Sequence, residues 1–171
     1  MVWLGFEHGK ITLGLFVNPQ RWWADLALGL ACGGLLIVLW QLGRAVFPAA
    51  RDLEAELRRR LGALSLSEAL ALALMSGFAE ELFFRGAVLD AWGWIAATVL
   101  FALLHAGPGK AFRLWTVFAG VAALGFAGLT LWRGNLLPAI TAHVTVNAVN
   151  LSYLARGGEA SAGASAARDG T

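Results

Sequence analysis

The apolar run from Leu66 to Leu89 contains three charged side chains, those of Glu80, Glu81 and Arg85. One charged side chain near the centre of a membrane helix costs about 2.5 to 3.5 kcal/mol, so a cluster of three would cost on the order of 7 to 10 kcal/mol without pairing or water. The chain can therefore fold in a membrane only if neighbouring helices pair these charges or enclose water beside them. Ionisable residues at that depth usually mark a functional site.

The composition of the chain is that of an integral membrane protein. Of its 171 residues, 58% are hydrophobic and 14% are charged, and the mean hydropathy is +0.67. These values exceed what soluble domains normally carry, and the length favours one domain. The formal net charge of +2 is typical of a polytopic chain with arginine and lysine in its cytoplasmic loops, so we expect the lipid bilayer and no nucleic acid as a partner.

We predict an all-α fold, a polytopic bundle of about five transmembrane helices, because segments of about 17 to 25 apolar residues cross a bilayer. In the first of these helices, Gly29 and Gly33 form a small-xxx-small pattern that lets another helix approach closely. Gly107-Pro108-Gly109 ends a shorter helix, since proline cannot continue it. The expected spans are residues 23–42, 66–89, 94–106, 114–132 and 136–155.

The segments between and beyond the spans carry charge or small polar residues. Leu53, Leu57 and Leu61 recur at spacing four among charged residues, which predicts an amphipathic helix at the cytoplasmic interface. Residues 1–156 are expected to form one transmembrane domain, and residues 157–171, rich in Ala, Gly and Ser, a disordered tail. Whether residues 1–22 add a further membrane segment is left open.

The distribution of basic residues predicts an N-out, C-in orientation. In the five-span interpretation nine arginines and lysines lie inside and three outside, in agreement with the positive-inside rule. Tryptophans also fall at the expected span ends, where amphipathic rings prefer to lie. The nine inside are Arg44, Arg51, Arg58, Arg59, Arg60, Lys110, Arg113, Arg156 and Arg168; the three outside are Lys10, Arg21 and Arg133.

Three further polar residues in apolar helices, together with Glu80, complete a candidate site. Glu80 lies eleven residues before the turn near Ala91 and His105 lies fourteen after it; at a rise of about 1.5 Å per residue both reach similar depth on antiparallel helices. His143 and Asn147 are one turn apart and share a helix face. We therefore expect Glu80, His105, His143 and Asn147 to meet in a water-accessible cavity that opens toward the cytoplasm.

The remaining two charged residues are expected to support this site. Glu81 and Arg85 are four residues apart on one helix, which favours an internal ion pair. Glu80 points about 100 degrees away from Glu81 and is therefore free for another task.

These residues resemble the three ordered motifs of the CAAX prenyl endopeptidase and bacteriocin-processing family, also called CPBP or Abi, of intramembrane glutamic-type proteases. The motifs are Glu80-Glu81-Leu82-Phe83-Phe84-Arg85-Gly86, then Phe101-x-x-x-His105, then His143-x-x-x-Asn147, within residues 66–153. The resemblance implies that Glu80 and His105 activate a water and that His143 and Asn147 stabilise the oxyanion. It implies supporting roles for Glu81 and Arg85, and a membrane protein or peptide as the substrate.

Two alternatives remain open at this point. Glu80, His105 and His143 could hold a zinc ion with water in the fourth position, but the chain lacks a HExxH helix, so a metal-free mechanism without a cofactor is favoured. A non-catalytic scaffold, immunity protein or transporter is the alternative from another class. The eleven arginines against two lysines are typical of GC-rich bacterial coding, which favours a bacterial inner membrane and disfavours prenylated CAAX proteins as substrates. The resemblance implies processing of a leader, a C-terminal sorting tag or a CAAX-type terminus.

Overall fold

The structure is a computed structural model that describes residues 6–7, 10–11 and 13–169. It confirms the all-α prediction, because outside one pair of two-residue strands the regular elements are helices. The strands β1 (Phe6–Glu7) and β2 (Lys10–Ile11) pair antiparallel. The helices are α1 (Leu13–Phe16), α2 (Trp22–Val46), α3 (Pro48–Leu61), α4 (Leu66–Glu81), the π-helix η1 (Leu82–Val88), α5 (Leu89–Leu104), α6 (Gly109–Arg133) and α7 (Leu137–Asp169).

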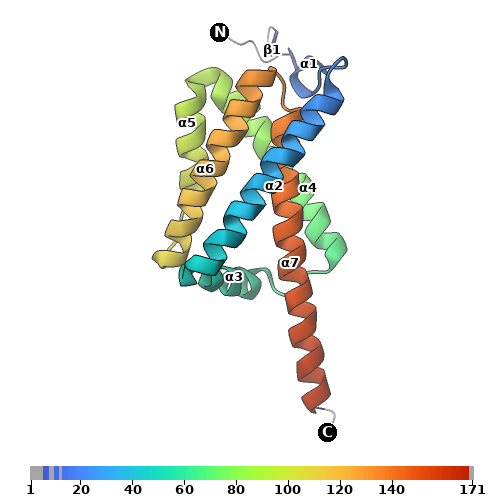
Figure 1. Cartoon of the computed structure of the whole chain (residues 1–171), viewed down its shortest axis with the longest axis vertical. Coiled ribbons are helices and arrows are strands. Elements are labelled where there is room, and N and C mark those ends of the chain that lie inside the picture. Colours follow the sequence, from blue (N-terminus) through green and yellow to red (C-terminus); the bar gives the residue numbers. More distant parts are fainter. Residues whose placement is uncertain (1–5, 8–9, 12, 170–171) are drawn as a thin grey trace.

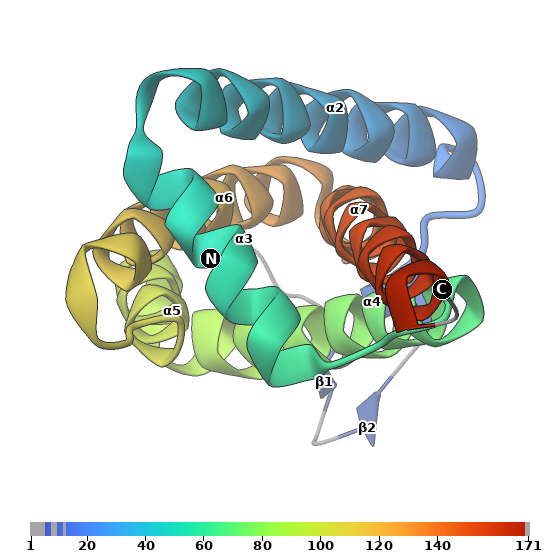
Figure 2. The same ribbon diagram turned by 90° about the horizontal axis from the view of Figure 1, so that it is seen from below.

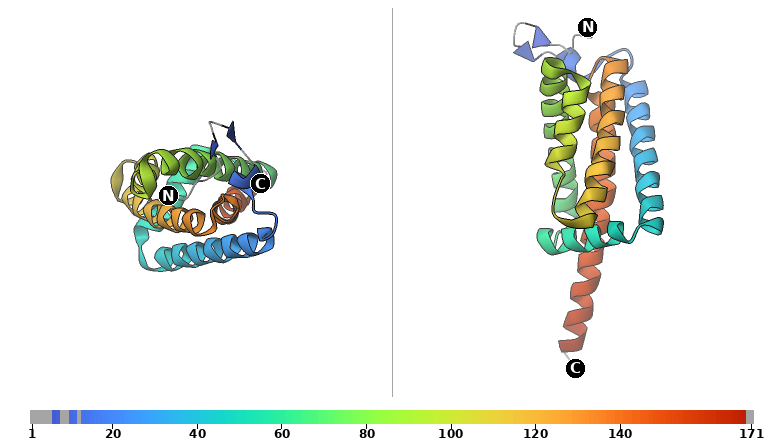
Figure 3. Two further views of the ribbon diagram at one scale, coloured as in Figure 1. Left: turned by 90° about the horizontal axis from the view of Figure 1, so that it is seen from above. Right: turned by 90° about the vertical axis from the view of Figure 1, so that its left-hand side faces the viewer.

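The long helices run side by side, and α3 lies across one end of them. Figure 1 shows α2, α5, α6 and α7 running along one another, with α5 at the edge away from α7, which packs mainly on α2 and α4. Seen from below, α3 crosses the end of the bundle (Figure 2), and the side view shows it almost perpendicular to the upright helices (Figure 3). The predicted amphipathic segment is therefore a helix that covers one end of the bundle.

Three helical stretches of the described residues are long and apolar enough to cross a membrane: Trp22–Val46, Leu66–Leu104 and Gly109–Arg133. The second contains two of the expected spans, since α4, η1 and α5 follow one another without a gap. Inside it Gly93 has a φ of 83°, a left-handed conformation that glycine adopts without steric cost. The chain reverses in this region. Length and hydropathy therefore identify three stretches instead of the five expected spans. Two of the expected spans are joined in the second stretch, and α7 is not among the three.

Local signals in the sequence set the boundaries of α4 and α3. The Ser65 hydroxyl accepts a hydrogen bond from the Glu68 amide at 3.3 Å, and the Glu68 carboxylate accepts one from the Ser65 amide at 2.8 Å. This capping box satisfies two amides that would otherwise lack partners at the start of α4. Helix α3 begins with Pro48 and stops at Gly62, whose φ is 68°. The start of α4 and both ends of α3 are therefore set by serine, proline and glycine residues that favour helix ends.

The small-residue pattern on α2 packs directly against α7. An added Cβ at Gly29 would lie 2.6 Å from the carbonyl oxygen of Pro138, and one at Gly33 would lie 2.9 Å from that of Ala142. Real Cβ atoms do not approach other atoms so closely. At the present separation of α2 and α7, these two positions therefore admit only glycine. The close approach also holds α7 in the register that places its polar residues.

Replacing Gly29 by Ala is expected to destabilise the protein by about 1 to 3 kcal/mol, because the methyl group must push α2 and α7 apart. The measurement is thermal unfolding of the purified protein in detergent. Gly34→Ala on the same helix is the matched control, since a Cβ there meets nothing within 4 Å. Equal melting temperatures for the two variants would contradict the close packing.

The end of the bundle opposite α3 is closed by apolar and polar contacts. Leu15 of α1 is fully buried with Phe84 and Leu136, and its carbonyl accepts a hydrogen bond from the Leu136 amide at 2.8 Å. Nearby, the fully buried Asp25 carboxylate pairs with Arg133 and accepts a hydrogen bond from Asn135 Nδ2 at 2.8 Å. These contacts tie the start of α2 to the loop between α6 and α7.

Helix α7 is longer than the expected span, because it continues from Leu137 to Asp169 beyond the bundle (Figure 1). The residues past Ala155 include many alanines, which have the highest helix propensity. The domain boundary at residue 156 and the disorder of residues 157–171 stay predictions.

Candidate active site

One cavity of about 300 Å³ receives the four residues singled out in the sequence. Glu80 comes from the last turn of α4 and His105 from the end of α5, while His143 and Asn147 come from α7. The cavity continues to Leu57 and other residues of α3. The structure therefore brings the predicted residues together beside a cavity that extends to the α3 end of the bundle.

Glu80 and His105 face each other across a short gap. Glu80 Oε2 lies 3.9 Å from His105 Nε2, although the residues are on different helices. His105 Nδ1 lies 2.8 Å from the carbonyl oxygen of Phe101; since a carbonyl can only accept, Nδ1 carries the proton. A neutral His105 then presents the lone pair of Nε2 to Glu80. At this distance the two atoms do not form a direct hydrogen bond, and Oε2 lies buried without a hydrogen-bond partner.

The contacts of the His105 ring hold it in this orientation. It stacks on Phe101 with ring centroids 4.4 Å apart and lies 6.0 Å from the ring of Trp115. The hydroxyl of Thr116 lies 3.3 Å from the His105 carbonyl oxygen, and 2.9 Å from its closer acceptor, the Phe112 carbonyl oxygen. The orientation of the His105 ring is therefore set by its stacking on Phe101 and by the hydrogen bond of Nδ1 to the Phe101 carbonyl oxygen.

Glu81 forms a buried cluster beneath the cavity. Its Oε1 lies 2.8 Å from Arg85 Nη1 and 2.8 Å from His143 Nδ1. The side chains of Glu81 and Arg85 are 0% exposed, whereas that of Glu80 is 32% exposed. This difference separates the two neighbouring glutamates: Glu80 is partly exposed and lines the cavity, and Glu81 pairs inside the protein.

The buried cluster sets the orientation of His143. Glu81 Oε1 already accepts a hydrogen bond from the Arg85 guanidinium, and a carboxylate oxygen only accepts, so Nδ1 of His143 donates its proton to Glu81. The ring of His143 stacks on Phe126, with centroids 5.1 Å apart. The Arg85 guanidinium also donates to the carbonyl oxygen of Ala123 at 3.2 Å. The other ring nitrogen, Nε2, is left for a group in the cavity.

Comparison with known proteins decides the family of the chain. A family model described as type II CAAX prenyl endopeptidase, Rce1-like, matches residues 62–149. The chain belongs to this Rce1-like family. All six predicted residues lie within the matched region. With its three candidate spans, this Rce1-like chain is an integral membrane protein of an endopeptidase family.

One curated relative of this Rce1-like chain is "Uncharacterized protein YpbD" of Bacillus subtilis (strain 168), which is 37% identical over 87 residues. The aligned region covers 50% of this chain and 44% of that protein, so the chain spans about half the length of the curated relative. No solved structure matches.

The donor set of the Rce1-like site does not match a metal centre. Within the described part of the chain, no three His, Cys, Asp or Glu side chains lie in an arrangement that could hold a metal ion. His143 and His105 direct Nδ1 to Glu81 and to a carbonyl oxygen, which leaves Nε2 of each ring free. The alternative zinc set of Glu80, His105 and His143 is not assembled into a metal-binding arrangement among the described residues.

Two contacts of the Rce1-like site do not follow from the sequence analysis. The first is the hydrogen bond between Glu81 and His143, 62 residues apart. The second is a hydrogen bond of 3.0 Å between Asn147 Nδ2 and Ser76 Oγ. Ser76 lies four residues before Glu80, so helical spacing alone places it on the same face. The four-residue spacing between Ser76 and Glu80 was therefore the sequence signal that could have placed Ser76 in the candidate site.

Proposed function

We propose that this protein is an intramembrane endopeptidase that hydrolyses peptide bonds of membrane-associated proteins or peptides. The observation that carries the proposal is the convergence of Glu80, His105, His143 and Asn147 on one cavity, with 3.9 Å between the glutamate and the first histidine. Membership of an endopeptidase family supports it.

In the proposed first step, a water between Glu80 and His105 attacks the carbonyl carbon of the substrate. One water hydrogen points to the carboxylate of Glu80 and the other to the lone pair of His105 Nε2. As the bond from oxygen to carbon forms, Glu80 takes the proton. General bases of this kind contribute typically about 10²- to 10⁴-fold in rate.

In the proposed second step, His143 and Asn147 stabilise the negative charge on the carbonyl oxygen. His143 already donates Nδ1–H to Glu81, so it donates to the oxyanion from Nε2 only as an imidazolium, which the Glu81 carboxylate stabilises. The amide of Asn147 supplies a second donor. When the bond from carbon to nitrogen breaks, the proton on Glu80 passes to the leaving amine. Removing one such donor typically costs about 10²- to 10³-fold in rate.

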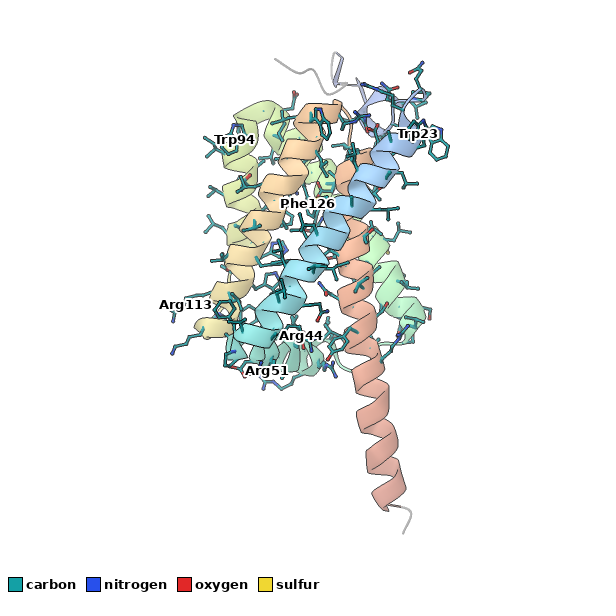
Figure 4. The ribbon with its side chains drawn as sticks, viewed as in Figure 1. Trp23, Arg44, Arg51, Trp94, Arg113 and Phe126 are labelled. Carbon is teal, nitrogen blue, oxygen red and sulfur yellow. The ribbon has the colours of Figure 1, made fainter. Side chains whose placement is uncertain are left out.

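We further propose a five-span, N-out, C-in topology, in which α4 with η1, α5 and α7 each cross the membrane beside α2 and α6. Trp23 and Trp94 lie at one end of the bundle, and Arg44, Arg51 and Arg113 lie at the other (Figure 4). The positive-inside rule then assigns the α3 end to the cytoplasm. The cavity extends to α3, so substrates enter from the cytoplasmic side.

The apolar lining of the cavity and its membrane setting favour hydrophobic peptide segments as substrates. Candidates are bacterial peptide leaders, C-terminal sorting tags and CAAX-type termini of membrane-associated proteins. These share an extended chain that brings apolar side chains into the cavity.

The test is cleavage of a library of apolar peptides by the purified protein in proteoliposomes, read by mass spectrometry. We expect internal cleavage of a subset of peptides, with full activity after incubation with a strong zinc chelator. Loss of activity in the chelator and its recovery on adding zinc would favour the zinc-dependent mechanism. A complete absence of cleavage across membrane-anchored and free peptides would favour the scaffold alternative.

A further inference from the structure

Asn147 is the proposed oxyanion donor whose orientation depends on a single contact. A side-chain amide presents either its NH2 group or its oxygen when it rotates by half a turn, and only the NH2 group can stabilise an oxyanion. An oxygen turned toward the same position would repel the developing charge. Some other group must therefore select between the two orientations.

We propose that Ser76 is a positioning residue that holds the Asn147 amide with one N–H directed to the cavity; this rests on the proposed function. Asn147 Nδ2 donates to Ser76 Oγ at 3.0 Å, and both residues line the cavity. The donation uses one of the two amide hydrogens. The second hydrogen stays free for the substrate oxygen.

The direction of the hydrogen bond follows from the surroundings of Ser76. Its hydroxyl lies 3.5 Å from the carbonyl oxygen of Ala73 in the preceding turn of α4. A carbonyl can only accept, so the hydroxyl hydrogen points there and a lone pair faces α7. That lone pair accepts from Nδ2 and disfavours the reversed amide, in which two oxygens would meet.

The backbone beside Ser76 keeps this contact in register. Ser76 precedes Gly77, where an added Cβ would lie 2.7 Å from Val144 Cγ2 of α7. Helices α4 and α7 therefore approach closely at this level. Ser76 and Asn147 are held across the narrow interface, which limits the movement of either side chain.

The kinetic test is Ser76→Ala in the peptide assay. We expect kcat to fall about tenfold with KM unchanged, because the amide spends part of its time reversed; complete loss of a donor costs about 10²- to 10³-fold. Ser76→Thr, which keeps the hydroxyl, is expected to recover most of the loss. Ser67→Ala, exposed on the same helix, is the matched control and should leave kcat unchanged.

A double-variant comparison separates positioning from general structural damage. In the Asn147→Ala background, adding Ser76→Ala is expected to cause no further loss of kcat, since the amide it orients is absent. An equal fold-loss in both backgrounds would overturn the proposal. So would a kcat of Ser76→Ala equal to that of the wild type.

A second measurement does not depend on cleavage and so separates this inference from the proposed function. The side-chain amide signals of Asn147 are identified in nitrogen-edited NMR spectra of the protein in detergent by their absence in Asn147→Ala. We expect the two amide hydrogens to differ in chemical shift and to move toward each other in Ser76→Ala. Unchanged signals would overturn the inference even if peptides are cleaved.

Discussion

Glu80→Gln is expected to lower kcat for peptide hydrolysis by at least about 10³-fold. Glutamine keeps the shape of the side chain and one carbonyl oxygen facing His105, but it cannot take a proton from water. In the proposed mechanism the carboxylate performs two proton transfers, one from the water and one to the leaving amine. The measurement is the rate of peptide cleavage in proteoliposomes, with protein amount and insertion matched to the wild type.

The same substitution is expected to leave the fold intact or make it more stable. One oxygen of Glu80 lies buried without a hydrogen-bond partner, so removing its charge relieves a desolvation cost. Asp90→Asn is the matched control, since it also converts a carboxylate to an amide but lies exposed at the start of α5. Cleavage retained by Glu80→Gln would end the proposal of glutamate-assisted hydrolysis.

The largest loss of stability is expected for Arg85→Met. Methionine fills similar space but leaves the Glu81 carboxylate buried beside His143 without the guanidinium. Removing one member of a buried ion pair typically costs about 3 to 5 kcal/mol, because the remaining charge is uncompensated. Thermal unfolding in detergent measures the effect. Arg113→Met, which removes an exposed arginine, is the control and should change the melting temperature little.

A double variant separates the structural from the chemical contribution of this cluster. Glu81→Gln combined with Arg85→Met removes both charges, so most of the lost stability should return. Activity should stay low, because His143 no longer has a carboxylate to stabilise its imidazolium. If the double variant regained both stability and activity, the proposed link from Glu81 to His143 would be wrong.

Short-range spacing explains which parts of the site could be predicted. Glu81 and Arg85 are one turn apart, and the structure places their ion pair at 2.8 Å. Counting residues from the turn near Ala91 brought Glu80 and His105 to one depth, and the two side chains do meet. The small residues Gly29 and Gly33 indicated a close helix contact but not its partner, which is α7. Local periodicity was sufficient for the ion pair, and helix length for the common depth of Glu80 and His105.

Long-range partners and changes of helical register could not be predicted. The π-helix from Leu82 to Val88 follows Glu81 directly and has no residue signature in the chain, because a π turn is set by packing rather than by propensity. The contact of Ser76 with Asn147 joins residues 71 positions apart. Helix α7, which contains the expected span 136–155, is less apolar than the three candidate spans, since it carries His143 and Asn147 together with threonines. The polar groups needed for chemistry weaken the signal for crossing the membrane.

The apolar layer of Leu15, Phe84 and Leu136 has a consequence for the energetics of the cell. A bacterial inner membrane stores a proton-motive force, and a continuous file of water through the bundle would dissipate it. The fully buried leucines of this layer lie at the end of the bundle away from α3, and none of the three residues lines the cavity. In the proposed topology, this apolar layer would separate the cavity from the outer side of the membrane and so preserve the proton gradient across the bilayer.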